Sequence, residues 1–233
     1  MVRHGFLHKS KMGYRMDTPT LDKILKILQK ESPNWKIPIV TVVAERSRDP
    51  FQVLISTLLS LRTKDEVTTV ASRRLFGRAK TPGNMLRLSE KEIQKLIYPV
   101  GFYKRKAENI LRVCQILIKQ YNSHVPDDLD NLLGLPGVGR KTANLVFTLG
   151  YGKPGICVDT HVHRISNRFG YVKTKAPDDT EMALRAKLPK RWWIPINDLL
   201  VAFGQSLCKP ISPWCSRCPI KHLCEKIGVE KHR

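Results

Sequence analysis

Four cysteines near the end of this chain constrain its fold more than any other sequence feature. They are separated by six, two and five residues: Cys208, Cys215, Cys218 and Cys224. Side chains so close in sequence can converge on one metal centre, which closes the intervening segments into a compact loop. The first residues are basic and lack the apolar middle of a secretory signal, so metal binding is favoured over disulfides.

The cysteine spacing favours an iron–sulfur cluster over zinc. Zinc modules usually pair two C-x2-C knuckles across a longer loop, and here only Cys215 and Cys218 form such a knuckle. Four thiolates in one continuous loop can instead hold a 4Fe-4S cluster. Structural zinc stays open as the alternative. A loop held in this way would present Lys209 and Arg217 to phosphates, so the metal would have a structural task.

Upstream of the cysteines, short amphipathic segments follow one another and predict an all-α fold. Asp49 before Pro50 is typical of a helix start, and the apolar segment that follows predicts a buried central helix. Ser89 and Glu92 match a capping box. No apolar run reaches the roughly 18 residues that a transmembrane helix needs, so no membrane is expected as a partner.

A glycine-rich turn, Leu-Pro-Gly-Val-Gly at 135–139, separates two of the helical patterns. Glycines let the backbone turn sharply and approach a ligand, and the first N–H groups of the next helix have no helical partner. Such a turn between helices indicates a helix-hairpin-helix, which binds nucleic-acid phosphates without reading base sequence. The predicted contacts are Leu135, Gly137, Val138, Gly139 and Arg140. The alternative is an ordinary turn with a glycine cap.

Lys141 lies in the first turn of the helix after this glycine turn, where a cation is disfavoured by the helix dipole. It is either a phosphate contact or a nucleophile. A nucleophilic amine must be neutral, and the positive helix end together with Arg140 favours that neutral form. Asp159, eighteen residues further on, precedes the next helical pattern. It can act as an N-cap and as the carboxylate partner of the lysine.

Charge points to the same kind of partner. The 233 residues include 41 lysines and arginines against 20 acidic residues, a net charge of +21. So large an excess indicates a polyanion such as nucleic acid. Residues 1–17 form a basic arm that we expect either to be disordered or to touch DNA.

Three elements together resemble the endonuclease III family of helix-hairpin-helix DNA glycosylases: LPGVGRKTAN, VDTHVHR and the four-cysteine tail. The resemblance runs from about residue 20 to residue 226. It implies a two-lobed all-α fold with DNA between the lobes. The implied parts are a six-helix barrel lobe at 44–153 and a discontinuous iron–sulfur cluster lobe at 18–43 and 154–233.

The resemblance also implies an activity, a base excision repair glycosylase that is also an abasic-site lyase. The family's nucleophilic lysine falls on Lys141 and its catalytic aspartate on Asp159. The lysine would attack the sugar as a Schiff-base former, and β-elimination would then cut the strand. The implied partner is double-stranded DNA with damaged bases or abasic sites. We expect a monomer that works inside the cell, in a prokaryotic nucleoid or in a nucleus or mitochondrion.

Two positions depart from the family's pattern. Arg62 stands where the family usually has a glutamine that fills the gap left by a flipped base. Phe102 stands where the family has a leucine wedge. Arginine can donate hydrogen bonds to the orphan base, and a phenyl ring can stack in the gap. Oxidised pyrimidines are the expected substrates, and uracil or thymine mismatched with guanine is the alternative.

Two other classes of protein stay open at this point. The charge, the hairpin and the cysteines also fit a module that binds damaged DNA without chemistry, in which Lys141 is only a phosphate contact. A zinc-dependent RNA-binding protein fits them less well. Covalent trapping on abasic-site DNA distinguishes an enzyme from the binding module. The metal content of the purified protein distinguishes an iron–sulfur protein from the zinc-dependent one.

Overall fold

The regular structure of this chain is helical throughout the part described by the computed structural model, residues 16–35, 38–47 and 49–233. No strand occurs in those ranges, so the predicted all-α fold is confirmed. The basic arm expected at 1–17 falls almost wholly outside the described residues. Only its end is seen, where the Asp17 side chain caps the first helix.

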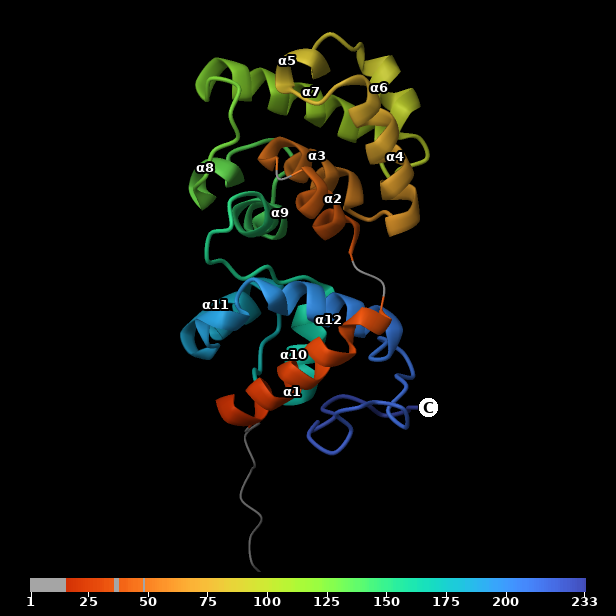
Figure 1. The fold of residues 1–233 in the computed structure, drawn as a ribbon, viewed down its shortest axis with the longest axis vertical. Coiled ribbons are helices and arrows are strands. Elements are labelled where there is room, and N and C mark those ends of the chain that lie inside the picture. The colour runs from red at the N-terminus through yellow and green to blue at the C-terminus, as the bar shows by residue number, and fades with distance from the viewer. Residues whose placement is uncertain (1–15, 36–37, 48) are drawn as a thin grey trace, which may run out of the picture.

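Eight helices and a closing π-turn surround the first of two hydrophobic cores (Figure 1). They are α2 (Ile39–Ser47), α3 (Pro50–Ser60), α4 (Asp65–Arg78), α5 (Pro82–Met85), α6 (Glu90–Ile97), α7 (Tyr103–Gln120), α8 (Leu129–Leu133), α9 (Arg140–Leu145) and the turn η2 (Val146–Gly150). Helix α3 lies at the centre, with buried residues all along it. This confirms the predicted buried helix.

The second core joins the start of the described chain to its end (Figure 1). Its elements are α1 (Thr18–Glu31), η1 (Ser32–Asn34), α10 (Thr160–Phe169), α11 (Pro177–Lys187), η3 (Lys190–Trp192) and α12 (Pro195–Ser206). The buried apolar residues of α1 all pack in this core: Leu21, Ile24, Leu25 and Leu28. The cysteine-rich segment after α12 packs against the same core.

Local signals in the sequence set several helix starts. The Asp49 side chain accepts from the Phe51 backbone N–H at 2.9 Å, with Pro50 in the first helical position. Ser89 and Glu92 form the expected capping box ahead of α6. Both predictions are confirmed, and each satisfies helix-terminal N–H groups that would otherwise lack a partner.

Polar contacts link the two cores. The Thr41 hydroxyl of α2 donates to Asp198 of α12 at 2.8 Å, and Arg140 of α9 pairs with Glu181 of α11. The predicted lobe boundary at residue 44 falls inside α2, whose Val40 belongs to the first core. We therefore propose that the first lobe begins with α2. Within the described ranges, no helix has the length and apolar character needed to cross a membrane.

Candidate active site

The glycine-rich turn joins α8 to α9 as a tight hairpin. Gly137 has a left-handed backbone with φ of 77°, a conformation that glycine adopts without strain. A Cβ at this position would lie only 2.7 Å from the Asn109 side-chain nitrogen. Gly139 is the N-cap of α9, and its carbonyl accepts from Ala143 N at 2.9 Å. The hairpin predicted from the sequence is therefore present, and its geometry requires glycine at 137.

The side chains and the backbone of this turn face opposite ways. Leu135 and Val138 are buried, at 3% and 7% exposure, and pack in the first core. Gly137 and Gly139 are exposed. The Val138 N–H is already used, because it donates to the Leu135 carbonyl at 3.1 Å. The side chains of the two apolar residues therefore anchor the turn in the core, and their contact with DNA stays a prediction.

Lys141 and Asp159 meet where the two cores adjoin. Lys141 Nζ lies 3.3 Å from Asp159 Oδ2, and the aspartate side chain is only 7% exposed against 40% for the lysine. The other oxygen, Oδ1, caps α10 by accepting from His161 N at 2.8 Å and Val162 N at 2.9 Å. One carboxylate oxygen therefore fixes the helix start, and the second is left to face the amine. The structure brings together the two residues that the sequence singled out.

Arg140 is placed differently from the expectation. Its guanidinium forms two hydrogen bonds with Glu181, at 3.1 and 2.9 Å, and that glutamate is 2% exposed. Arg185 and Asn144 also donate to Glu181. The charge that we expected to favour a neutral Lys141 is therefore compensated by a buried carboxylate. Arg140 still borders the site, and its contact with DNA stays a prediction. The sequence pattern did not identify Glu181, since it lies on an ordinary helical face.

Arg62 and Phe102 also come together, although forty residues separate them in sequence. The Arg62 guanidinium carbon lies 5.7 Å from the centre of the Phe102 ring. Both residues have left-handed backbone, with φ of 52° and 57°, and Phe102 is 64% exposed. Non-glycine residues seldom adopt this conformation, and such strain is often found where a side chain must be aimed.

Lys106 lies beneath these two turns and was not identified from the sequence. It is 8% exposed, and burial lowers the pKa of its amine to about 8. Its Nζ donates to backbone carbonyls at the end of α3. A signal was present in the sequence, because Lys106 precedes Ile110 by four residues and so falls on the apolar stripe of α7.

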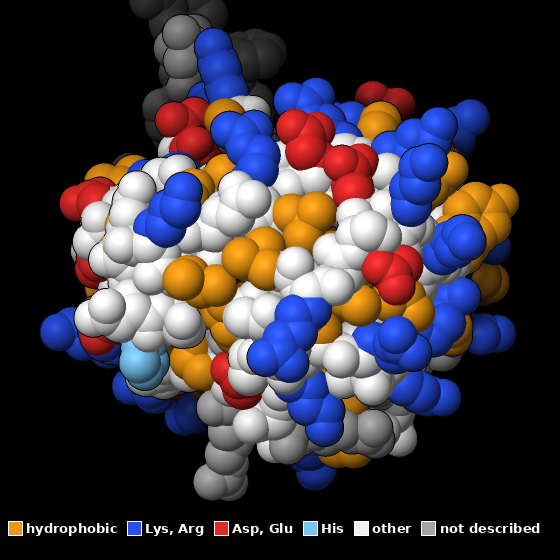
Figure 2. Space-filling model, turned by 90° about the horizontal axis from the view of Figure 1, so that it is seen from above, with side chains coloured by type: hydrophobic (Ala, Val, Ile, Leu, Met, Phe, Trp, Pro, Cys, Tyr) orange, Lys and Arg blue, Asp and Glu red, His pale blue; other side chains and the backbone are white. Residues whose placement is uncertain are grey.

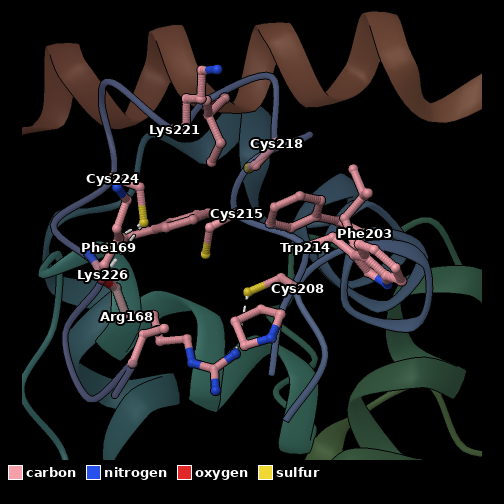
Figure 3. Close-up of a pocket in the computed structure, with 14 residues that line it drawn as sticks. Arg168, Phe169, Phe203, Cys208, Trp214, Cys215, Cys218, Lys221, Cys224 and Lys226 are labelled. Carbon is pink, nitrogen blue, oxygen red and sulfur yellow. Dashed lines mark hydrogen bonds between the residues drawn. The ribbon is translucent and has the colours of Figure 1, made fainter. Parts of the chain in front are cut away.

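The four cysteines surround one cavity beside the second core (Figure 3). All four are free thiols. Arg168, itself 7% exposed, donates to Cys208 Sγ at 3.4 Å and to the Lys209 carbonyl at 2.7 Å. The Lys226 N–H donates to Cys224 Sγ at 3.4 Å. Sulfur atoms that ring a cavity and accept N–H bonds are a donor set suited to an iron–sulfur cluster.

The same loop carries the two predicted cations on its outside. Lys209 and Arg217 are both exposed, and the Arg217 guanidinium stacks 5.0 Å from the centre of the Trp214 ring. Burial raises the pKa of the Cys218 and Cys224 thiols to about 11. A bound metal is what would hold such thiols in the ionised form. Among the described residues, no group of three His, Cys, Asp or Glu side chains is arranged for a single metal ion.

Basic side chains crowd parts of the molecular surface. Figure 2 shows the end of the molecule formed by the first core, where lysines and arginines gather over the side occupied by α4 and α6. Acidic side chains are fewer on this face. The distribution follows from the net charge of +21 and creates an attractive potential for a polyanion.

Comparison with known proteins defines the class of this fold and site. Residues 55–191 match the family model of the HhH-GPD superfamily of base excision DNA repair proteins. The chain is 50% identical to Endonuclease III of Thermotoga maritima over 180 residues, which cover 77% of this chain and 84% of that protein. It is 42% identical to Endonuclease III homolog 2, chloroplastic, of Arabidopsis thaliana, and there spans 57% of the relative's length.

Solved structures agree with these relatives. A trapped Endonuclease III–DNA covalent intermediate superposes with a TM-score of 0.80 at 34% identity, over 91% of this chain and 97% of that one. A thermostable thymine-DNA glycosylase superposes with a TM-score of 0.75 at 25% identity, over 89% and 96% of the two chains. The chain belongs to the endonuclease III family. It is a DNA glycosylase of base excision repair, so the reading as a module without chemistry is wrong.

Proposed function

We propose that this glycosylase is bifunctional, and that Lys141 and Asp159 carry out both base release and strand cleavage. The observation that carries the proposal is the 3.3 Å contact between Lys141 Nζ and Asp159 Oδ2 where the two cores adjoin. A related Endonuclease III has been trapped as a covalent intermediate with DNA, which supports a nucleophile in the same fold.

The geometry supports the following sequence of steps. The damaged nucleotide leaves the helix, because an enzyme cannot reach C1′ within the stack. Asp159 Oδ2 takes a proton from Lys141 and passes it to the departing base, so that the carboxylate is ionised again and balances the positive charge that grows on the sugar. The neutral Nζ attacks C1′, the bond to the base breaks, and the base leaves with the electron pair. The C1′–O4′ bond of the sugar then opens, and O4′ takes the proton that the attached nitrogen loses, which gives the Schiff base. The Schiff base acidifies the C2′ proton. Loss of that proton to water forms the C2′–C3′ double bond and expels the 3′ phosphate.

Double-stranded DNA with a damaged base or an abasic site is the proposed partner. We propose that the protein binds it as a monomer, inside the cell. The exposed backbone at Gly137 and Gly139 supports a phosphate contact, as do the exposed Lys209 and Arg217. If binding neutralises roughly six phosphates, the logarithm of affinity should fall with the logarithm of salt at a slope of about −5. A flat salt response in a fluorescence titration would contradict a phosphate-led interface.

The cofactor that the cysteine site fits best is a 4Fe-4S cluster, held by Cys208, Cys215, Cys218 and Cys224. Support comes from four free thiols spread around one cavity, a donor set suited to a group larger than a single ion. When bound, the cluster supplies rigidity to the loop that carries the cations. The test is metal analysis of purified protein. About four irons per chain with a broad brown absorbance supports the cluster, and zinc without iron contradicts it.

Oxidised pyrimidines are the proposed substrates, and a mismatched uracil or thymine is the second candidate. A specific observation favours the second: Arg62 and Phe102 form one exposed pair instead of the family's glutamine and leucine. Arginine is well suited to an orphan guanine, because it can donate twice to the O6 and N7 atoms. The likeness to a thymine-DNA glycosylase points the same way.

One experiment tests both activity and substrate. Duplexes that each carry one damaged or mismatched base are incubated with the protein, and base release and borohydride trapping are measured on each. The proposal expects covalent adducts on abasic-site DNA and on the preferred lesion. Base release without any adduct would leave a monofunctional glycosylase and would remove the nucleophilic role of Lys141.

A further inference from the structure

We propose that Lys106 is a positioning residue for lesion recognition, holding the Arg62 and Phe102 turns together so that both can enter the gap left by a flipped base. This inference rests on the proposed function, because it assigns a task within base release. The two turns are far apart in sequence, and each has strained backbone. A single buried residue contacts both, the first through its side chain and the second through its backbone.

The side chain of Lys106 fixes the first turn. Its Nζ donates to the Leu59 carbonyl at 2.8 Å, to the Leu61 carbonyl at 2.6 Å and to Thr63 Oγ1 at 3.2 Å. The last carbonyls of a helix have no partner within the helix, and a cation there is favoured by the dipole. Lys106 therefore caps the end of α3 and holds the backbone before Arg62 and the Thr63 side chain after it.

The backbone of Lys106 fixes the second turn. Its N–H donates to the Phe102 carbonyl at 3.0 Å, which closes the first turn of α7 directly behind the wedge residue. The two turns also touch each other. Gly101 N donates to Thr63 Oγ1 at 3.2 Å, and a Cβ on Gly101 would lie 2.7 Å from the Arg62 carbonyl oxygen. One residue thus ties both recognition turns into a single unit.

A purely stabilising role is a poor account of this lysine. It is 8% exposed, and its partners are two carbonyls and a hydroxyl with no carboxylate among them. Burial alone lowers the pKa of the amine, which shows that enclosing the charge is unfavourable. Removing the ammonium would take a donor from two carbonyls, so the melting temperature of the variant is measured beside its activity. The benefit of the ammonium is therefore geometric, because three acceptors converge on it.

Helix α7 extends this link to the phosphate-binding turn. Asn109, one turn after Lys106, lies against Gly137, where an added Cβ would come within 2.7 Å of its side-chain nitrogen. Phe102, Lys106, Asn109 and Gly137 line one small pocket. The same helix face therefore sets the spacing between the gap-filling pair and the hairpin that holds the strand.

The test compares Lys106→Met, Thr63→Val and the matched control Lys119→Met, an exposed lysine on the same helix. Gap filling is followed by the fluorescence of 2-aminopurine placed opposite a tetrahydrofuran abasic-site analogue. Wild type and Lys119→Met should give the full fluorescence change. Lys106→Met should give less than half of it. Thr63→Val should give an intermediate value, because it removes the contacts of Lys106 and Gly101 with Thr63 Oγ1 but keeps both carbonyl contacts of the ammonium.

Kinetics separate positioning from general damage. At saturating protein, Lys106→Met should release the preferred lesion at least about tenfold more slowly, since hydrogen bonds from a charged group are lost. Trapping at a preformed abasic site should fall less than about threefold, because that nucleotide has no base to unstack. Thermal melting checks the fold. If Lys106→Met does not fold, the Thr63→Val variant tests the inference instead. That variant keeps the Lys106 ammonium, and valine has nearly the same shape as threonine.

Two results would overturn the inference: an unchanged fluorescence response in both variants, or equal losses in base release and abasic-site trapping. Failure of the proposed function gives a different pattern, because wild type itself would then release the base without forming a borohydride adduct, while the fluorescence comparison would still test the inference. The two failures are therefore distinguishable in the same set of reactions.

Discussion

The proposed catalytic pair and the proposed lesion-reading pair are built in different ways. Lys141 and Asp159 stand at the starts of two helices, α9 and α10, and each helix is packed in its own core. Arg62 and Phe102 stand on exposed turns with left-handed backbone. Their support comes from Lys106, whose contact with Leu59 spans 47 residues of sequence.

This difference in support separates the residues proposed for the chemistry from those proposed for lesion recognition. Helix starts on packed cores hold reacting groups in a fixed place, which is what proton transfer and nucleophilic attack require. Side chains on exposed turns can be substituted without displacing those reacting groups. The chain therefore keeps the family's lysine and aspartate while departing from its pattern at both recognition positions.

The largest effect is expected at the nucleophile. Lys141→Gln should lower base release and borohydride trapping by about 10³-fold or more, because the amine proposed to attack C1′ is removed. Affinity for abasic-analogue DNA should change less than about threefold. Single-turnover kinetics and a binding titration measure the two quantities. Base release at the wild-type rate would refute the covalent assignment.

The next largest effect is expected at the aspartate. Asp159→Asn keeps an oxygen for the N–H groups of His161 and Val162 but removes the negative charge. Base release should fall about 10²-fold, because the sugar cation loses its balancing charge. The melting temperature should stay within a few degrees of wild type. A parallel loss of stability would show that the residue acts mainly as a helix cap.

Sequence alone predicted the parts of the molecule that depend on local signals. Asp49, Ser89 and the turn at Gly137 set helix ends within a few residues of themselves, so their patterns were sufficient. The pairing of Lys141 with Asp159 crosses two cores. A lysine in a first helical turn and an aspartate before a helix start suggested the pair, and the resemblance to the endonuclease III family implied the role of each residue.

Long-range electrostatic partners could not be predicted in this way. Glu181 neutralises Arg140 across 41 residues, and nothing near either residue in the sequence indicates the pairing. The burial of Lys106 could not be predicted for a related reason. A lysine beside an apolar helix face usually extends into solvent, and only the acceptors that the fold brings to it show that it is buried. Burial of a charge becomes visible only when distant segments are placed around it.

A smaller effect is expected at the recognition pair. Changing Arg62→Gln and Phe102→Leu together restores the family's side chains and removes the guanidinium that can donate to guanine. The ratio of rates for one lesion opposite guanine and opposite adenine should fall about tenfold. Trapping at an abasic site should stay near the wild-type level. An unchanged ratio would show that opposite-base preference is set elsewhere.

The smallest effect concerns the interface between the cores, close to the catalytic pair. Burial raises the pKa of Asp198 to about 6, and Glu45 and Asp159 add repulsion, while the Thr41 hydroxyl opposes the shift. The folded state therefore binds this proton more tightly than the unfolded state does. Its contribution lowers stability as the pH rises from about 4 to about 6, and the loss persists above that range.

Asp198→Asn should accordingly stabilise the protein at pH 7.5 and have little effect near pH 4. The amide oxygen can still accept from Thr41, while the cost of a buried charge is removed. The expected gain is at most about 2–3 kcal/mol, or roughly 5–8 °C in melting temperature. The matched control Asp178→Asn, an exposed residue on α11, should change stability by less than about 0.5 kcal/mol. Equal melting shifts at both pH values would mean that Asp198 is not protonated preferentially in the folded state, and that the interface beside Asp159 tolerates its charge.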